Sequence, residues 1–312
     1  MIYNSILDLV GNTPMVKLKR ITEHVPSNVY AKLEFFNPSG SVKDRAALNM
    51  INDAEKKGRL NKDSVIVEAT SGNTGIALAT IAAAKGYRII LVIPDTMSID
   101  KINHIKALGA EVVLTPGVFG MKKAFLVAEE MMKNIPNSFM PDQIRNPANP
   151  EIHRIATASE IWNDLNGNID FFVAASGTGG TVTGTGRGLK GFNPDIKVVC
   201  VEPDGSPVLS GGKRGPHKIQ GVGPGFIPDV TDVSVFDEII RVKDDNALET
   251  SRKLARMEGI FCGISAGAST YAAIQIAKKY EDKNIVVIIP DTGERYLNTE
   301  LFNEEFAGTM VS

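Results

Sequence analysis

Residues 64–93 read SVIVEATSGNTGIALATIAAAKGYRIILVI, and this stretch decides the fold. It opens with a run of mostly Val and Ile at Ser64–Ala69, and a second such run follows at Arg88–Ile93. Near-continuous Val and Ile content is typical of parallel strands that are covered on both faces. Between the runs, Thr74–Lys85 is a helical segment, and Gly86 suits the left-handed residue that ends a helix. The stretch therefore predicts a strand, a helix and a parallel strand joined by a right-handed crossover.

The same alternation extends along most of the chain. Four more β-rich runs follow, at Glu111–Leu114, Asp170–Ala174, Lys197–Val201 and Asn284–Ile289. Amphipathic segments lie before and between them, at Asp44–Lys57, Lys101–Leu108, Lys122–Lys133 and Asn246–Glu258. Three further glycines suit the same left-handed position after a helix, namely Gly58, Gly109 and Gly259. The pattern predicts an α/β protein with mostly parallel sheets covered by helices.

A chain of 312 residues predicts about two domains at roughly 150 residues each. The sequence NPANP at Asn146–Pro150 is the best candidate for a linker near the midpoint. A second irregular stretch, Pro203–Pro228, is rich in Gly and Pro. A loop of that length in a compact domain is usually functional.

Composition excludes several classes of protein. A content of 43% hydrophobic and 22% charged residues excludes a disordered chain, and a net charge of −2 predicts no nucleic-acid partner. No apolar run approaches the ~18–20 residues of a membrane span. The N-terminal MIYNSILDLVGNTP lacks the features of a signal peptide, and the two cysteines, Cys200 and Cys262, show no pairing pattern. We expect a cytoplasmic protein without a membrane partner, and the scattered histidines predict no metal site.

A glycine-rich loop, ASGTGGT at Ala175–Thr181, follows the predicted strand Asp170–Ala174 directly. Glycines allow a ligand to approach the backbone closely, and the N–H groups at the start of the next helix attract anions. Thr178 and Thr181 add hydroxyl donors. The loop therefore suits a phosphate group, although a tight turn would also require glycine.

Two more polar loops stand beside predicted helices. The loop TSGNTG at Thr70–Gly75 offers hydroxyls, an amide and N–H groups to a carboxylate, but the same residues are ordinary helix caps. The segment NPSGSVKDR at Asn37–Arg45 places Lys43 where a Gly/Ser turn meets a helix. Most lysines are solvated charges. Beside a phosphate loop, however, a lysine can form a Schiff base with a phosphorylated aldehyde cofactor.

Two other motifs suggest different functions. Gly186–Gly191 matches G-x-G-x-x-G, and Glu202 follows the next strand, as in nicotinamide-binding proteins. This match starts beyond the strand end, inside a predicted helix, so its context is wrong. Gly263–Gly267 matches the G-x-S-x-G of serine hydrolases around Ser265. All four histidines precede Ser265, whereas that fold places its histidine after the serine.

Taken together, these loops resemble the fold-type II pyridoxal-phosphate enzymes, most closely the cysteine synthase and cystathionine β-synthase family. The similarity extends from Leu9 to Leu297, nearly the whole chain. The matching stretches, in order, are NPSGSVKDR, TSGNTGIALA, KALGAEVVLTPG, NPANP, GTGGTVTG, KIQGVGPGFIP and GISAGA. Several long motifs in the right order are far more specific than any single loop.

The resemblance implies roles for individual residues. The lysine that matches Lys43 holds pyridoxal 5′-phosphate as a Schiff base and is the catalytic base. The asparagine that matches Asn73 binds the ring oxygen of the cofactor, and the serine that matches Ser265 faces the pyridine nitrogen. The cofactor phosphate is bound by residues matching Gly177, Thr178, Gly179, Gly180 and Thr181. The amino-acid substrate is bound by residues matching Thr70, Ser71, Gly72, Thr74, Gln143 and Gly221.

The activity that the resemblance implies is β-replacement at Cβ of an amino acid through an aminoacrylate intermediate. The leading interpretation is L-cysteine synthesis from O-acetyl-L-serine and sulfide. The alternative is a cysteine lyase that uses L-cysteine as donor, releases hydrogen sulfide and gives L-serine, lanthionine or cystathionine. A more remote alternative is a catalytically idle relative that only binds a partner. One sequence does not rank the nucleophiles, because a small change in a pocket shifts selectivity by only ~1–3 kcal/mol.

The resemblance also implies the larger organisation. We expect a smaller α/β domain at 44–145, and a larger one made of 1–43 and 146–312, with the active site between them. The family is usually homodimeric, and its active site can bind the C-terminal tail of serine acetyltransferase. Several residues depart from the common family pattern, namely Ile144, Ala158, Ser159, Ala175, Ser176 and Pro224. None of them removes an expected cofactor contact.

Overall fold

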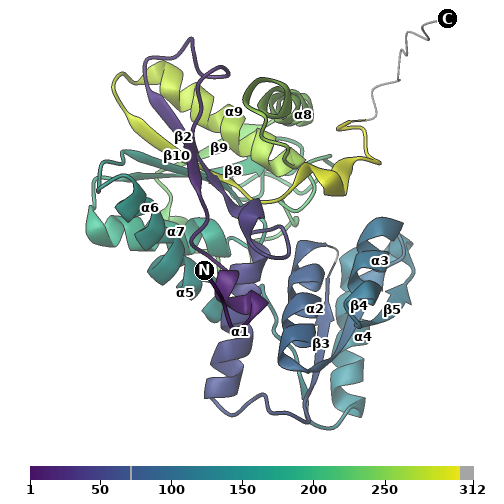
Figure 1. Cartoon of the computed structure of the whole chain (residues 1–312). Helices are drawn as coiled ribbons and strands as arrows, with labels where there is room; N and C mark the ends of the chain where they lie inside the picture. Colours follow the sequence, from purple (N-terminus) through teal and green to yellow (C-terminus); the bar gives the residue numbers. More distant parts are fainter. Residues whose placement is uncertain (71, 303–312) are drawn as a thin grey trace, which may run out of the picture.

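The computed structural model describes residues 1–70 and 72–302, and it confirms an α/β fold with two separate sheets. Figure 1 shows the smaller sheet beside α2 and α3 at the lower right and the larger sheet at the upper left. The strands of the smaller sheet fall between Val65 and Phe139, and those of the larger sheet lie on both sides of this range. This arrangement agrees with a smaller domain inserted into a larger one, whose limits at 44 and 145 stay a prediction.

The smaller sheet has four parallel strands in the order β5-β4-β3-β6. Its strands are β3 (Val65–Ala69), β4 (Arg88–Pro94), β5 (Glu111–Thr115) and β6 (Ser138–Phe139). Its helices are α1 (Lys43–Lys56), α2 (Asn73–Lys85), α3 (Ile99–Ala107) and α4 (Gly120–Asn134). Buried side chains of α1, α2 and α3 pack on one face of this sheet, and those of α4 pack on the other. Both faces are therefore covered, as the Val and Ile runs predict.

The larger sheet has six strands in the order β1-β2-β10-β7-β8-β9, of which only β1 is antiparallel to its neighbour. Its strands are β1 (Met15–Lys17), β2 (Asn28–Leu33), β7 (Phe171–Ala175), β8 (Lys197–Pro203), β9 (Glu238–Val242) and β10 (Asn284–Ile289). Its helices are α5 (Ala148–Ile152), α6 (Ala158–Asp164), α7 (Gly180–Phe192), α8 (Asp244–Lys253) and α9 (Ile264–Lys279). α8 and α9 cover one face, and α6 and α7 cover the other.

Short helical turns complete the described chain. The 3-10 turns are η1 (Ile6–Leu9), η2 (Glu34–Phe36), η3 (Gly117–Phe119), η5 (Val233–Val235) and η7 (Gly293–Tyr296). Two π-helical turns, η4 (His153–Thr157) and η6 (Leu254–Glu258), continue α5 and α8. No helix in residues 1–70 and 72–302 is long and apolar enough to cross a membrane.

Helix ends and the expected linker can be compared with the sequence. The glycines predicted to follow helices all have the left-handed conformation, with φ between 67° and 83° at Gly58, Gly86, Gly109 and Gly259. The expected linker NPANP is instead the start of a helix, because α5 begins at Ala148 and Pro150 is buried within it. A proline in the first turn of a helix lacks only an N–H group that would have no partner there.

Candidate active site

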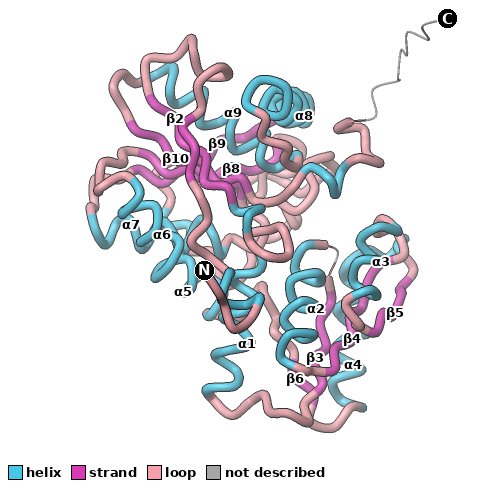
Figure 2. The backbone as a smooth tube through the Cα atoms, in the orientation of Figure 1, coloured by secondary structure: helices cyan, strands magenta, loops and turns pink. Residues whose placement is uncertain are grey.

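Polar loops that are distant in the sequence follow the carboxyl ends of parallel strands. One loop joins β3 to α2, a second joins β7 to α7, and Asp291 comes two residues after β10. In open α/β sheets, ligands bind beyond the carboxyl ends of the strands. Much of the backbone between the two sheets is loop (Figure 2). The hydrogen bonds described next bring these loops together into one candidate site.

Lys43 is the first residue of α1, and it lies beside the segment that follows β10. Ser41 forms a β-bridge with Asp291, and the Val42 N–H donates to the Pro290 carbonyl at 2.8 Å. Burial lowers the pKa of the Lys43 amine, and the nearby carboxylate of Asp291 opposes this shift. An amine with a lowered pKa is a better nucleophile and base near neutral pH. The structure therefore gives Lys43 the environment that a Schiff-base lysine requires.

Asn73 starts α2, and both atoms of its amide have partners in the C-terminal part of the chain. Its Nδ2 donates to Asp291 Oδ2 at 2.7 Å, and its Oδ1 accepts a hydrogen bond from Arg295. Because a carboxylate only accepts and a guanidinium only donates, these partners fix the orientation of the amide. Within the described chain, the second Nδ2 hydrogen has no acceptor, so it can serve a ligand oxygen.

Asp291 is buried, and only one of its oxygens has a hydrogen-bond partner in the described part of the chain. Oδ2 accepts from Asn73 and, at 2.7 Å, from the hydroxyl of Tyr296. Oδ1 is buried and has no hydrogen-bond partner among residues 1–70 and 72–302. A Cβ at Gly263 would lie 2.3 Å from this oxygen, so only glycine fits beside it. Such an orphaned acceptor suits a ligand that carries an N–H group.

The loop before α2 carries most of the predicted substrate residues. Thr70 is buried, and its Oγ1 accepts from the Gly72 N–H at 3.3 Å. Thr74 donates its hydroxyl to Gln143 Oε1 at 2.7 Å, so these two predicted residues are in contact. Ser71 lies outside the described residues. Among the described residues, no side chain caps the start of α2, and the N–H groups of Asn73 and Thr74 have no partner, so they can face an anion.

The loop between β7 and α7 contains the residues predicted to bind a phosphate. α7 has no side-chain N-cap, and the N-cap residue Gly179 has a φ of 78°. A Cβ at Gly177 would lie 2.4 Å from the Gly221 carbonyl oxygen, which explains why glycine is needed there. Thr178 Oγ1 accepts from the side chain of Asn149 at 3.0 Å. Thr181 Oγ1 lies 3.3 Å from Nε2 of the buried His153.

The predicted site residues Gly221 and Ser265 lie on two further segments. Besides the contact of Gly221 with Gly177, the Gly223 N–H donates to the Ser176 carbonyl at 3.0 Å, so the Gly221 loop packs on the phosphate loop. Ser265 is buried in the first turn of α9. Its hydroxyl makes no hydrogen bond within the described chain, and it is therefore available to a ligand.

Five residues contribute to this arrangement although the sequence analysis gave them no role. They are Glu68, Asn149, Asp291, Arg295 and Tyr296. One signal could have identified Asp291, since it follows a buried strand of the same sheet as the phosphate loop. The others are recognised only through their hydrogen bonds in the structure, and the partners of Glu68 and Arg295 are far away in the sequence.

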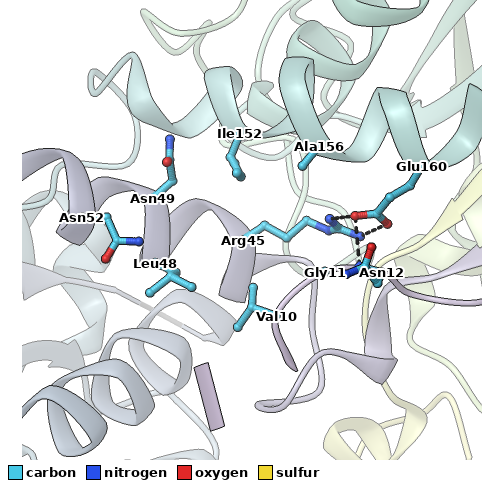
Figure 3. A pocket seen from close by; sticks show the side chains of 10 residues that line it. All are labelled: Val10, Gly11, Asn12, Arg45, Leu48, Asn49, Asn52, Ile152, Ala156 and Glu160. Carbon is cyan, nitrogen blue, oxygen red and sulfur yellow. Dashed lines mark hydrogen bonds and ion pairs between the residues drawn. The ribbon is translucent and has the colours of Figure 1, made fainter. Parts of the chain in front are cut away.

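A separate cavity of about 220 Å³ lies beside α1 (Figure 3). The Arg45 guanidinium crosses one end of it and pairs with Glu160 at 2.6 Å. None of the predicted cofactor or substrate residues lines this cavity. Its lining consists of Val10, Gly11, Asn12, Arg45, Leu48, Asn49, Asn52, Ile152, Ala156 and Glu160.

The structure disfavours both alternative motifs. Gly186–Gly191 lies inside α7, and a Cβ at Gly186 would lie 2.7 Å from Val235, so this glycine serves helix packing. Ser265 makes no hydrogen bond to any histidine in the described chain, so it has no base. A nicotinamide site and a serine hydrolase are thus both unsupported.

Comparison with protein families gives an independent result. A family model described as "Pyridoxal-phosphate dependent enzyme" matches residues 6–291. A probable cysteine synthase of Bacillus subtilis (strain 168) is 55% identical over 300 residues, which cover 95% of this chain and 96% of that protein.

Solved structures with closely similar folds include enzymes with different activities. The crystal structure of O-ureido-L-serine synthase matches with a TM-score of 0.95 and 47% identity, over 99% of this chain and 98% of the other. A hydrogen sulfide-producing enzyme from Fusobacterium nucleatum matches with a TM-score of 0.91 and 48% identity. That match covers 95% of this chain and 100% of the other.

Proposed function

The chain belongs to the family of pyridoxal-phosphate dependent enzymes, and from this premise we propose that it makes L-cysteine from O-acetyl-L-serine and sulfide. The observation that carries the proposal is the contact network that joins Lys43, Asn73 and Asp291. Asp291 accepts from the Asn73 amide, and its charge acts on the nearby Lys43 amine. Curated cysteine synthases at 49–55% identity support the choice of reaction.

The donor set of the site fits pyridoxal 5′-phosphate. When bound, this cofactor supplies an aldehyde that links to an amine and a ring that accepts electrons from Cα of the substrate. Lys43 would hold the aldehyde, and Asn73 would donate to the ring oxygen. Ser265 would face the pyridine nitrogen. The phosphate would lie at the N-terminus of α7, bound by Gly177, Thr178, Gly179, Gly180 and Thr181. Thr178 Oγ1 accepts the Gly180 N–H there at 3.3 Å.

The amino-acid donor would bind on the smaller sheet. We propose that Thr70, Ser71, Gly72, Thr74 and Gln143 bind its carboxylate. The contact between Thr74 and Gln143 supports this assignment, because it leaves the Gln143 Nε2 hydrogens for an acceptor. Gly221 would line the site near the amino group of the donor.

Lys43 would carry the proton during the reaction. Its Nζ takes the Cα proton of the donor, the Cβ–O bond breaks, and acetate leaves with the electron pair. Hydrosulfide then forms the new Cβ–S bond, and Lys43 returns a proton to Cα. The lowered pKa of Lys43 supports this role, because the neutral amine is the form that accepts a proton.

The visible absorbance of the purified protein tests the proposal. We expect a band from bound pyridoxal phosphate that Lys43→Ala lacks, whereas Lys56→Ala, an exposed lysine on the same helix, keeps it. O-acetyl-L-serine should change this band, and sulfide should restore it while L-cysteine forms. If no band appears after pyridoxal phosphate is added, the proposal is wrong. Turnover that Lys43→Ala abolishes would exclude a function limited to partner binding.

A second candidate is a cysteine lyase that releases hydrogen sulfide. The similarity to the hydrogen sulfide-producing enzyme of Fusobacterium nucleatum favours it. The same experiment separates the two reactions when L-cysteine and L-serine are added in place of O-acetyl-L-serine. If only L-cysteine changes the band and sulfide is released, the lyase is the correct assignment.

We further propose that the protein is a homodimer. Exposed apolar side chains support this, since Ile6 and Leu9 of η1 and Ile155 of η4 are 40–48% exposed. Val10 and Ala156, the neighbours of Leu9 and Ile155, line the same cavity, which places the two segments side by side. An apolar patch of this kind is typical of a surface that a partner covers.

Two finer assignments complete the proposal. The C-terminal tail of a serine acetyltransferase would bind near Phe226 and Ile227, which are exposed in the loop that contains Gly221. A synthetic peptide of that tail should compete with O-acetyl-L-serine.

We also propose a cytoplasmic location, which the two unpaired cysteines, Cys200 and Cys262, support.

A further inference from the structure

The turn that carries Gln143 has an unusual backbone. β6 ends at Phe139, which pairs with Ile66 of β3. Pro141 then provides no N–H for further pairing along β3. Asp142 has a φ of 50°, a left-handed conformation that non-glycine residues rarely adopt. Since the strand ladder has ended, another contact must hold this turn against β3.

Glu68 of β3 provides that contact. Its side chain is completely buried, and its Oε2 accepts the Asp142 N–H at 2.9 Å. The Gln143 N–H lies close enough to the same carboxyl group to lower its pKa. Its other oxygen, Oε1, is buried and has no partner in the described chain. Burial raises the pKa of Glu68 to about 8, with the Asp142 carboxylate adding to the shift. One carboxyl group therefore replaces the missing strand partner for the Asp142 amide and also lies close to the next amide.

Gln143 is held at two more points. Asn149 Nδ2 donates to the Gln143 carbonyl at 2.7 Å and to Thr178 Oγ1 at 3.0 Å. Thr74 donates to the Gln143 side chain at 2.7 Å. Backbone N–H, backbone carbonyl and side-chain amide are thus each fixed by a different element. The amide Nε2 is the one polar group of Gln143 left without a partner among the described residues.

We propose that Glu68 is a positioning residue that fixes Gln143 to bind the carboxylate of the amino-acid donor. This inference rests on the proposed function, which assigns Gln143 to the donor. Glu68 itself does not touch the donor. It acts by holding the Asp142–Gln143 backbone, and a side chain of equal size without an acceptor would leave the Asp142 N–H without its partner.

Two substitutions at the same position test this role. Glu68→Gln keeps an acceptor oxygen for both amides, whereas Glu68→Met keeps the size and removes the acceptor. The probe is L-alanine, which has a carboxylate but no leaving group at Cβ. Its dissociation constant is measured on the holoenzyme from the change in visible absorbance. We expect Glu68→Met to weaken binding about tenfold and Glu68→Gln to stay within about twofold of the wild type.

Kinetics and hydrogen exchange provide separate readouts. In steady-state assays, Glu68→Met should raise the KM for O-acetyl-L-serine more than it lowers kcat. The amides of Asp142 and Gln143 should exchange faster in Glu68→Met and at the wild-type rate in Glu68→Gln. A general loss of stability would instead accelerate exchange throughout the smaller sheet and would not be rescued by glutamine.

Three results would overturn the proposal. One is equal L-alanine binding in Glu68→Met and the wild type. Another is equal impairment of Glu68→Gln and Glu68→Met. The third is unchanged L-alanine binding in Gln143→Ala, which would make the contact purely structural. Failure of the proposed function looks different, because the wild type itself would then show no absorbance change with any amino acid.

Discussion

Asp291 affects two proposed cofactor residues, since it accepts from Asn73 and raises the pKa of Lys43 against the larger effect of burial. Asp291→Asn removes the charge at almost unchanged size, so the pKa of Lys43 should fall further. The neutral amine then exists at lower pH. We expect uptake of pyridoxal phosphate by the apo-protein, followed by absorbance, to begin at lower pH in the variant. Asp282→Asn at an exposed turn is the control. If uptake has the same pH dependence in Asp291→Asn and in the wild type, the role of Asp291 is contradicted.

Gly177 offers a second test at the scale of one residue. A methyl group there would lie 2.4 Å from a backbone oxygen, which cannot move without displacing the Gly221 loop. Gly177→Ala should therefore weaken the binding of pyridoxal phosphate by more than about tenfold in an absorbance titration. Gly191→Ala is the matched control, because a methyl group added there would have no atom within 4 Å. Equal affinities of the two variants would show that the loop tolerates the change.

At the scale of elements, Arg45 ties α1 to η2 and α6. It pairs with Glu34 at 2.6 Å and with Glu160 at 2.6 Å, and both Arg45 and Glu34 are almost completely buried. Arg45→Leu would leave the Glu34 carboxylate buried without its cation. We expect the free energy of unfolding to fall by about 3–5 kcal/mol. Urea unfolding followed by the fluorescence of Trp162 measures this change.

An exposed pair on the smaller sheet provides the comparison. Arg88 and Glu111 also lie 2.6 Å apart, but more than half of each side chain is exposed. Arg88→Leu should therefore lower the free energy of unfolding by much less than Arg45→Leu. A loss as large as that for Arg45→Leu would mean that burial does not decide the difference between the two ion pairs.

The buried carboxyl on β3 predicts a pH dependence of stability. The pKa of Glu68 is about 8 in the folded protein, compared with 4.5 for an unperturbed glutamate. Between these values the folded state binds more protons than the unfolded state. The contribution of Glu68 to the free energy of unfolding is therefore largest below pH 4.5 and is lost as the pH rises to 8. The free energy of unfolding falls over this range by at most about 1.4 kcal/mol per pH unit.

Glu68→Gln removes this titration. The free energy of unfolding of the variant, minus that of the wild type, should therefore rise between pH 5 and pH 8 and level off above it. Urea unfolding at several pH values measures this difference. A difference that stays constant with pH would show that Glu68 titrates in the folded state as it does in water.

Some of the strands can be predicted from the sequence, and others cannot. The buried parallel strands are predictable because Val and Ile dominate them, as in Val65–Ala69. β2 is not predictable from the sequence in this way, because it contains Lys32, and lysine is usually exposed. Lys32 is buried in the structure through its ion pair with Glu160 at 3.1 Å, a partner far away in the sequence. A local pattern carries no information about such a partner.

The same limit applies to the candidate site. The loops around Lys43, Asn73 and Gly177 are predictable, because glycines and small polar residues at strand ends have a local signature. The role of Glu68 is not predictable, since the sequence shows it only as one residue within a strand. Its role depends on the turn at Asp142 and Gln143, which only the three-dimensional structure brings beside it.

At the scale of the whole molecule, the proposed dimer makes a direct prediction. Ile155→Asp places a charge on the exposed apolar patch of η4 without burying it in the monomer. We expect light scattering to give twice the mass of the chain for the wild type and the mass of one chain for the variant. Leu126→Asp, on the exposed side of α4, is the control. A monomeric wild type would contradict the proposed dimer.

The strand order of the larger sheet has a consequence for protein synthesis. β10, nearly the last strand of the chain, lies between β2 and β7 near the middle of the sheet. The ribosome makes β2 about 250 residues before β10, so β2 and β10 cannot pair until most of the chain has been made. The smaller sheet needs only residues up to Phe139 and can fold early. Asp291 follows β10 and is made after Asn73, so the proposed site is complete only after the ribosome has made β10.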